Sequence, residues 1–209
     1  MFESKSFILG SGSPRRKELL KAAGINFSVD CSSHVNENHP KDLPSRDIPE
    51  YLSIKKSEGF HRPLEEDEVL ITADTIVLLP AENYDAIDLG FISDVMKRAD
   101  TVLEKPTDRN SAIAMLTSLS GRSHFVYTGV CVRDINHKVC FTDKTRVHFC
   151  ELSFNEIEYY VDKFKPFDKA GAYGIQEWIG YIGIDAIEGS YYNVMGLPVS
   201  KLFRVLKNF

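Results

Sequence analysis

Val69-Leu-Ile-Thr-Ala-Asp-Thr-Ile-Val-Leu-Leu79 is the most apolar run in the sequence and is rich in β-branched residues. Such a composition predicts a strand that is buried on both faces of a sheet. Asp74 lies in the middle of this run. Because an ionised carboxylate costs several kcal/mol or more when it leaves water without a partner or a metal, Asp74 must be compensated. Either it holds a neighbouring loop through backbone N–H groups, or it belongs to a functional site.

The segments on either side of this run alternate between apolar stretches of strand length and amphipathic stretches of helix length. Strands are expected over residues 6–9, 25–31, 69–79, 124–132, 139–150 and 179–187. Helices are expected between Pro14 and Gly24, over 48–59 and 91–99, between Asp108 and Gly121, and over 153–164 and 198–206. Because these elements follow no regular β-α-β rhythm, we expect a single domain over residues 1–209 with a mixed α/β sheet.

The composition limits the classes of function. With 209 residues, of which 43% are hydrophobic and 26% charged, the chain can bury the core of an ordinary globular protein. Its formal net charge of −5 argues against a nucleic-acid backbone or an anionic membrane as partner. The apolar runs stop well short of the ~18 residues of a transmembrane helix. The first residues also lack the order of basic and apolar residues that marks a secretion signal.

The cysteine pattern favours a reducing environment. The four cysteines form no Cys-x-x-Cys pair. They are Cys31, Cys131, Cys140 and Cys150. In a chain of this size without a secretion signal, free buried thiols are expected in place of disulfides or a zinc site. We therefore expect a cytoplasmic protein.

Gly10-Ser-Gly-Ser-Pro-Arg-Arg16 forms the first candidate site. It follows a short strand and begins a helix, with a serine that fits the N-cap and a proline at the first helical position. Small residues let a backbone approach a ligand, and a helix N-terminus points N–H groups at an anion. Two arginines in a first helical turn oppose the helix dipole, so the pattern favours an anion site with Ser11, Arg15 and Arg16 over an exposed basic turn. It is not a Walker loop.

Asp168-Lys-Ala-Gly-Ala-Tyr-Gly-Ile-Gln176 forms the second candidate site. Its small residues lie between charged residues and an amide, which suits a backbone folded closely around a ligand. A tight structural turn with an Asp–Lys pair explains the pattern equally well. Lys56 and Lys105 are ordinary when considered singly, although Pro106 fixes the turn that presents Lys105. The six histidines lack the spacing of metal ligands.

The candidate residues together comprise acids, cations and one amide. They are Glu37 and Asp74, then Arg15, Arg16, Lys56 and Lys105, and finally Gln176. Carboxylates hold hard divalent cations, while guanidinium and ammonium groups neutralise phosphate charge. This set therefore suits a polyphosphate substrate that is bound through a divalent metal.

The sequence also resembles a known family, the Maf-type nucleoside triphosphate pyrophosphatases. The resemblance covers nearly the whole chain and rests on several blocks in the same order. These blocks are Leu-Gly-Ser-Gly-Ser-Pro-Arg-Arg (9–16), Ala-Asp-Thr-Ile-Val (73–77), Leu-Glu-Lys-Pro (103–106), Leu-Ser-Gly-Arg-Ser-His (119–124), Asp-Lys-Ala-Gly-Ala-Tyr-Gly-Ile-Gln (168–176) and Gly-Ser-Tyr-Tyr-Asn-Val-Met-Gly-Leu-Pro (189–198). Several blocks in order are more specific than any one motif.

The resemblance implies an activity and a role for each candidate residue. The activity is hydrolysis of a nucleoside triphosphate between its α and β phosphates, which gives the monophosphate and diphosphate. Asp74 matches the general base, and with Glu37 it would hold Mg²⁺, Mn²⁺ or Co²⁺. Lys56 and Lys105 would join Asp74 in catalysis. The positions that match phosphate-handling residues are Ser11, Arg15, Arg16, Lys56 and Lys105.

Base selectivity is implied by the same resemblance. Arg15, Thr75 and Gln176 fall where the family discriminates between bases, and the Ala-Tyr-Gly-Ile-Gln form resembles the branch that acts on dTTP and UTP. A glutamine amide can pair with the N3–H and O4 edge of thymine or uracil. Two alternatives stay open. One is selectivity for 7-methyl-GTP or another purine, and the other is a nucleotide-binding regulator of cell division without useful turnover.

The family fold is an elongated mixed α/β structure with a cleft between two lobes, similar to the inosine triphosphatase fold. Two features of this sequence depart from the family pattern. Residues 80–101 form a longer connection than expected, which we interpret as a surface excursion, a lid or a homodimer contact. Asn36 stands where many relatives carry an acid, so Glu37 is the only carboxylate there to support a metal.

Overall fold

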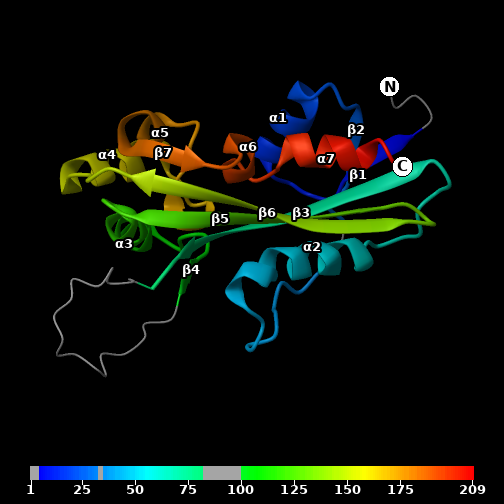
Figure 1. Ribbon diagram of the computed structural model, residues 1–209, viewed down its shortest axis with the longest axis horizontal. Helices are drawn as coiled ribbons and strands as arrows, with labels where there is room; N and C mark the ends of the chain where they lie inside the picture. Colours follow the sequence, from blue (N-terminus) through cyan, green and yellow to red (C-terminus); the bar gives the residue numbers. More distant parts are fainter. Residues whose placement is uncertain (1–4, 33–34, 82–99) are drawn as a thin grey trace.

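The computed structural model describes residues 5–32, 35–81 and 100–209. They form a mixed seven-stranded sheet in the order β2-β1-β3-β5-β6-β7, with β4 paired to β3 outside this path (Figure 1). The strands are β1 (Ser6–Leu9), β2 (Phe27–Val29), β3 (Glu68–Leu79), β4 (Thr101–Leu103), β5 (Ser123–Arg133), β6 (Lys138–Phe149) and β7 (Ile184–Glu188). The helices are α1 (Pro14–Ala22), α2 (Ile48–Glu58), α3 (Arg109–Leu119), α4 (Phe154–Phe164), α5 (Trp178–Gly183), α6 (Tyr191–Val194) and α7 (Val199–Leu206). The predicted mixed α/β class is confirmed.

The strand β3 is the centre of the sheet. It pairs with β1 in parallel and with β4 and β5 in antiparallel orientation. Val69, Leu70 and Ile71 are fully buried, as expected for a strand that is covered on both faces. Asp74 and Thr75, in its middle, are only half-buried. The predicted central strand is thus confirmed. Solvent reaches it at Asp74.

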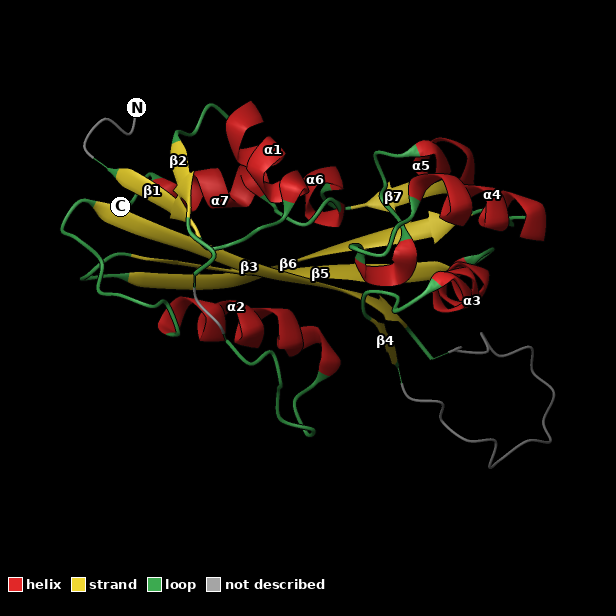
Figure 2. Cartoon of the chain, turned by 180° about the vertical axis from the view of Figure 1, so that it is seen from behind, coloured by secondary structure: helices red, strands yellow, loops and turns green. Residues whose placement is uncertain are grey.

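Helices cover both faces of this sheet. The helix α2 lies on one face, and α1, α6 and α7 lie on the opposite face, as the view from behind also shows (Figure 2). Asp108 caps α3, where it forms a capping box with Ser111, and Ser153 forms a capping box with Glu156 at the start of α4. Among the helices that the structure describes, none is long and apolar enough to cross a membrane.

The helix α2 approaches the sheet closely because β5 carries a glycine beneath it. A Cβ on Gly129 would lie 2.2 Å from the carbonyl carbon of Pro49 in the first turn of α2. Two hydrogen bonds fix the rest of the helix. Thr72 Oγ1 donates to the Ser53 carbonyl at 2.7 Å, and Arg133 Nη2 donates to a carbonyl in the last turn at 2.9 Å. The helix is therefore anchored along its length.

Two strand predictions need correction. The prediction over 179–187 is wrong in its first half, because Trp178–Gly183 form α5. The chain folds back tightly there, since a Cβ on Gly180 would lie 1.8 Å from the Ile175 carbonyl oxygen. The strand predicted over 25–31 is limited to Phe27–Val29, because its partner β1 ends at Leu9. The helix predicted over 91–99 lies outside the described residues.

The cysteines are free, as predicted, but they are not all buried. Cys131 is buried between strands of the sheet, whereas Cys31 is exposed because it follows the edge strand β2. Cys140 and Cys150 have intermediate exposure.

We predict that Gly129→Ala lowers the free energy of unfolding by about 1–3 kcal/mol, the usual cost of overpacking a tight contact. The new methyl group would meet the backbone of α2, which cannot rotate away. Denaturant unfolding measures the change. Gly12→Ala is the matched control, because its Cβ would meet only Cys31 Sγ at an ordinary 3.8 Å. Equal stability of the two variants would contradict the close docking of α2.

Candidate active site

The candidate site lies where one edge of β3 lacks a strand partner. On this edge β1 pairs as far as Ile71, and β4 pairs from Val77 onward. Among the described strands, residues 72–76 pair only with β5, on the other edge. A cavity of about 570 Å³ opens at this gap. It is lined by all of the predicted site residues, namely Ser11, Arg15, Arg16, Glu37, Lys56, Asp74, Thr75, Lys105 and Gln176.

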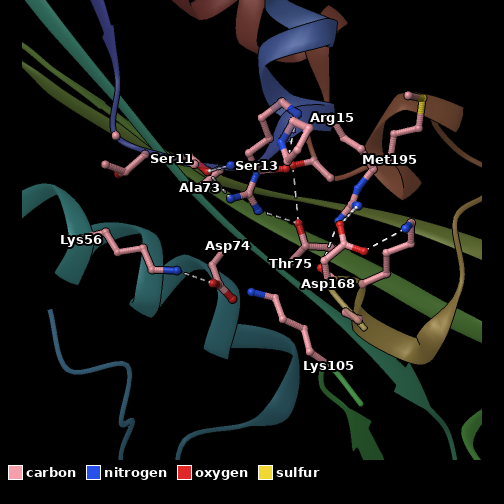
Figure 3. Close-up of a pocket in the computed structure, with 18 of the residues that line it drawn as sticks. Ser11, Ser13, Arg15, Lys56, Ala73, Asp74, Thr75, Lys105, Asp168 and Met195 are labelled. Carbon is pink, nitrogen blue, oxygen red and sulfur yellow. Dashed lines mark hydrogen bonds and ion pairs between the residues drawn. The ribbon is translucent and has the colours of Figure 1, made fainter. Parts of the chain in front are cut away.

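The cavity has two sides because adjacent residues of a strand point to opposite faces of a sheet. Asp74 points to the α2 face, where it meets Lys56. Thr75 points to the opposite face, where it meets Arg16 from α1. Residues from both faces of the sheet line the same cavity at this gap. Figure 3 shows Lys56, Asp74 and Thr75 around the cavity.

Arg16 joins three separate segments at the site. Its Nε donates to the Gly196 carbonyl at 2.9 Å, and its two Nη atoms donate to Ser11 Oγ and Thr75 Oγ1, each at 3.1 Å. Burial lowers the pKa of Arg16 by more than the charge of Asp74 raises it. Since a guanidinium has five N–H donors, Arg16 keeps donors for an anion after these three bonds. These hydrogen bonds hold the loop at Ser11 against β3.

Arg15 lies at the same helix N-terminus but pairs across the cavity. Its Nη1 donates to Asp168 Oδ2 at 2.6 Å (Figure 3). Asp168 also accepts from Lys169 Nζ at 2.8 Å, and Lys169 Nζ lies 3.0 Å from Glu177 Oε1. Burial raises the pKa of Asp168, but the hydrogen bonds from Lys169 and Arg15 outweigh it and hold that pKa below its ordinary value. Asp168 therefore holds Arg15 in place, and Lys169 connects Asp168 to Glu177.

The two predicted metal-binding acids meet at one lysine. Lys56 Nζ lies 2.7 Å from Asp74 Oδ1 and 3.2 Å from Glu37 Oε2. The side chains of Lys56 and Asp74 are only 19% and 14% exposed. The lysine is placed by α2, and the aspartate by β3. Lys105, which follows β4, points toward Asp74 from the other direction (Figure 3). The carboxylate of Asp74 therefore lies between two ammonium groups.

Gln176 ends the second candidate stretch and lines the cavity. Its Oε1 is buried and makes no hydrogen bond within the described part of the chain. A buried acceptor without a partner is costly, so it is a strong candidate for contact with a ligand donor. The neighbouring backbone is held by Tyr160, whose hydroxyl accepts from Gly174 N at 3.0 Å and donates to Glu177 Oε2.

Some residues of this site were not predicted from the sequence. Asp168 and Lys169 were left between a ligand-binding and a structural interpretation, and the structure places both in the cavity wall. Tyr160, Glu177 and Gly196 were missed. One signal was available for Tyr160, because a tyrosine on the apolar face of a helix needs a partner for its hydroxyl. No local pattern connects Gly196 with Arg16, which lies 180 residues earlier.

None of the histidines in the described residues lines the cavity. His124 is buried against Tyr173, and burial lowers its pKa to about 3, so it is neutral at pH 7. Within residues 5–32, 35–81 and 100–209, no group of three or more His, Cys, Asp or Glu side chains is arranged to hold a metal ion.

Comparisons with known proteins identify the family of this chain. Residues 6–209 match the family described as Maf-like protein. A dTTP/UTP pyrophosphatase of Bacteroides thetaiotaomicron is 47% identical over 96% of this chain and 94% of its own length. Proteins of the same name from Parabacteroides distasonis and Porphyromonas gingivalis are 46% and 43% identical, over 97% of this chain and 95% and 93% of their lengths. Because the match runs through every element that forms the cavity, this chain belongs to the Maf-like protein family.

Proposed function

We propose that this protein is a metal-dependent pyrophosphatase that hydrolyses dTTP and UTP between the α and β phosphates. The observation that carries the proposal is the position of Asp74, a half-buried carboxylate in a cavity whose walls carry Arg15, Arg16, Lys56 and Lys105. The cavity volume of about 570 Å³ lies within the range of small-molecule sites. The names of the relatives support pyrimidine triphosphates as substrates.

The donor set suits a divalent cation. Glu37 and Asp74 already converge on one cationic atom, Lys56 Nζ. Mg²⁺ is commonly held by one or two carboxylates together with substrate phosphates and water, and Mn²⁺ or Co²⁺ can take such a place. When bound, the ion would polarise phosphoryl oxygens and offset the charge of the triphosphate. Asn36 adds no carboxylate, so the substrate would complete the coordination.

The side chains that line the cavity have different roles in the proposed reaction. Asp74 accepts a proton from the water that attacks the α-phosphorus. Lys105 and Lys56, on either side of it, neutralise charge on the departing diphosphate, and Arg15 adds a guanidinium at the helix N-terminus. Ser11 and the backbone N–H groups of its loop face the same anion. Arg16 fixes this loop against β3, so the phosphate donors are preorganised before substrate binds.

Gln176 provides a physical basis for base selectivity. Its buried Oε1 is an acceptor, and N3–H of thymine or uracil is a donor. Cytosine presents an acceptor at N3, so it cannot donate a hydrogen bond to Oε1 from that position. Thr75 and Arg15 border the same cavity and are proposed to complete the discrimination.

The proposal extends to the architecture around the site. We infer that the cavity is the cleft between two lobes of an elongated molecule, and that the protein acts in the cytoplasm. The homodimer contact suggested for residues 80–101 stays a prediction, because 82–99 lie outside the described residues.

We predict that Asp74→Asn lowers turnover of dTTP by roughly 10²-fold or more, the scale of lost general-base catalysis. An amide keeps the size of the side chain but cannot accept the proton of the attacking water. Pyrophosphate release under saturating Mg²⁺ measures the effect. Asp162→Asn, an exposed change on α4, is the control, and unfolding of both variants checks their folds. Near-normal turnover of Asp74→Asn would remove this residue from its role.

We predict that Gln176→Leu lowers kcat/KM for UTP roughly tenfold to a hundredfold, because N3–H would lose its partner in a buried site. The wild-type protein should act poorly on 3-methyluridine triphosphate, which lacks N3–H. The variant should treat UTP and the methylated nucleotide nearly alike. A panel that also contains CTP, GTP and 7-methyl-GTP tests the alternative selectivity. A purine preference would refute the assignment of Gln176.

A further inference from the structure

We propose that the Lys56 ammonium is a built-in counter-ion that occupies the place of the divalent cation in the nucleotide-free protein. It would leave this place when metal and nucleotide bind together. The inference rests on the proposed function, because the nucleotide is the ligand that receives the displaced lysine. The affinities for metal and for nucleotide would then be coupled through the side chain of Lys56.

The contacts of Lys56 support this assignment. Its Nζ is held by one oxygen of each predicted metal ligand, Asp74 and Glu37, at 2.7 and 3.2 Å. These two carboxylates and the ammonium carry a net charge of −1. A divalent cation between the same oxygens would lie within a few ångströms of the ammonium, and like charges at that separation repel strongly in a partly buried site. The metal and the bound ammonium therefore exclude each other.

The displacement needs only the side chain to move. The backbone of α2 is anchored on both sides of Lys56, by the Thr72–Ser53 bond and by Arg133 at Ser57. A lysine has a flexible four-carbon stem, so its ammonium can turn from the carboxylates toward a phosphate in the same cavity. A nucleotide supplies that phosphate, but a metal ion alone does not. Lys56 thus penalises metal binding until the substrate is present.

Linkage makes this coupling reciprocal and measurable. If nucleotide raises the affinity for metal, then metal raises the affinity for nucleotide by the same factor. The part of the penalty that Lys56 imposes should disappear when the positive charge at residue 56 is removed. Lys55 offers a matched control, because it is the adjacent lysine on α2 and its Nζ donates to the Asn38 carbonyl at 2.8 Å, not to either carboxylate.

We predict that Lys56→Met binds Mn²⁺ at least about tenfold more tightly than the wild type when no nucleotide is present, since a charge repulsion is removed. Electron paramagnetic resonance of free Mn²⁺ gives the dissociation constants. A dTTP analogue with a methylene group between its α and β phosphates should tighten Mn²⁺ binding to the wild type much more than to Lys56→Met. Lys55→Met should behave as the wild type.

Equal Mn²⁺ affinity of the wild type and Lys56→Met would overturn the proposal. An equal gain for Lys55→Met would do the same, because it would show a general charge effect of α2. If Lys56→Met does not fold, Lys56→Gln removes the charge and keeps a hydrogen-bond donor. The nucleotide-free titration involves no turnover, so its result stands even if the protein fails to hydrolyse dTTP.

A second inference rests on a different pair of residues. Cys131 and Cys140 lie directly opposite each other on β5 and β6, and their Sγ atoms are 2.8 Å apart. Opposed residues of antiparallel strands have Cα separations that a disulfide can bridge. Neither sulfur lines the candidate active site. We infer that this pair is an oxidisable dithiol that forms a reversible disulfide with a peroxide oxidant.

The reaction balances with hydrogen peroxide as oxidant. The Cys140 thiolate, which is only partly buried, attacks a peroxide oxygen, the O–O bond breaks, and the leaving hydroxide becomes water. Cys131 Sγ then attacks the oxidised sulfur of Cys140. The S–S bond forms as the S–O bond breaks, and the thiol proton of Cys131 leaves with hydroxide as water. Two thiols are oxidised by two electrons, and one peroxide is reduced to two waters.

We predict that peroxide removes two of the four thiols and lowers the protein mass by two hydrogens. Burial and the hydrogen bond with Cys131 raise the pKa of Cys140 to about 12, so the rate should rise between pH 7 and pH 9 as thiolate increases. Intact mass spectrometry and peptide mapping should find Cys131 linked to Cys140. Dithiothreitol should restore both thiols.

The double variant Cys31→Ser/Cys150→Ser should react like the wild type, and adding Cys140→Ser should abolish the mass loss. Mapping on the unaltered protein keeps the test valid if the triple variant does not fold. A link that involves Cys31 or Cys150, a disulfide between molecules, or overoxidation of Cys140 without a link would each overturn the inference.

Discussion

The carboxylate of Asp74 interrupts the most buried strand of the sheet, and the site is built around the need to compensate its charge. On one edge of β3 the partner strands β1 and β4 stop short of it, which leaves residues 72–76 beside a cavity. On the face of the sheet, α2 brings Lys56 to within 2.7 Å. An acid that would be costly in a continuous sheet is stable here because a cation and solvent reach it.

Several charged groups of the cavity pair with one another. Arg15 pairs with Asp168, Lys169 with Asp168 and Glu177, and Lys56 with Asp74. A triphosphate would therefore exchange partners with these paired groups. Such exchange favours ligands that carry several negative charges, because a neutral ligand has no anionic group to replace the carboxylate partners of the lysines and arginines.

Local patterns in the sequence predicted what depends on local physics. The β-branched run gave β3, and the capping residues Asp108 and Ser153 gave the starts of two helices. The resemblance gave the set of site residues, which the structure brings to one cavity. Contacts between residues that lie far apart in the sequence could not be predicted from these local patterns. The bond from Arg16 to Gly196 spans 180 residues, and no periodicity in the sequence reveals that Gly180 in α5 lies against the Ile175 carbonyl.

One glycine shows how far the site depends on such distant contacts. Gly129 is the residue of β5 that lies opposite Asp74 in the sheet. Opposed residues of an antiparallel pair point to the same face with Cβ atoms about 4.5–5.5 Å apart, so any larger residue at 129 would stand beside the carboxylate. The same position is where the first turn of α2 touches the sheet. The missing side chain thus lets the first turn of α2 lie against β5 opposite Asp74, and the same helix brings Lys56 to that carboxylate.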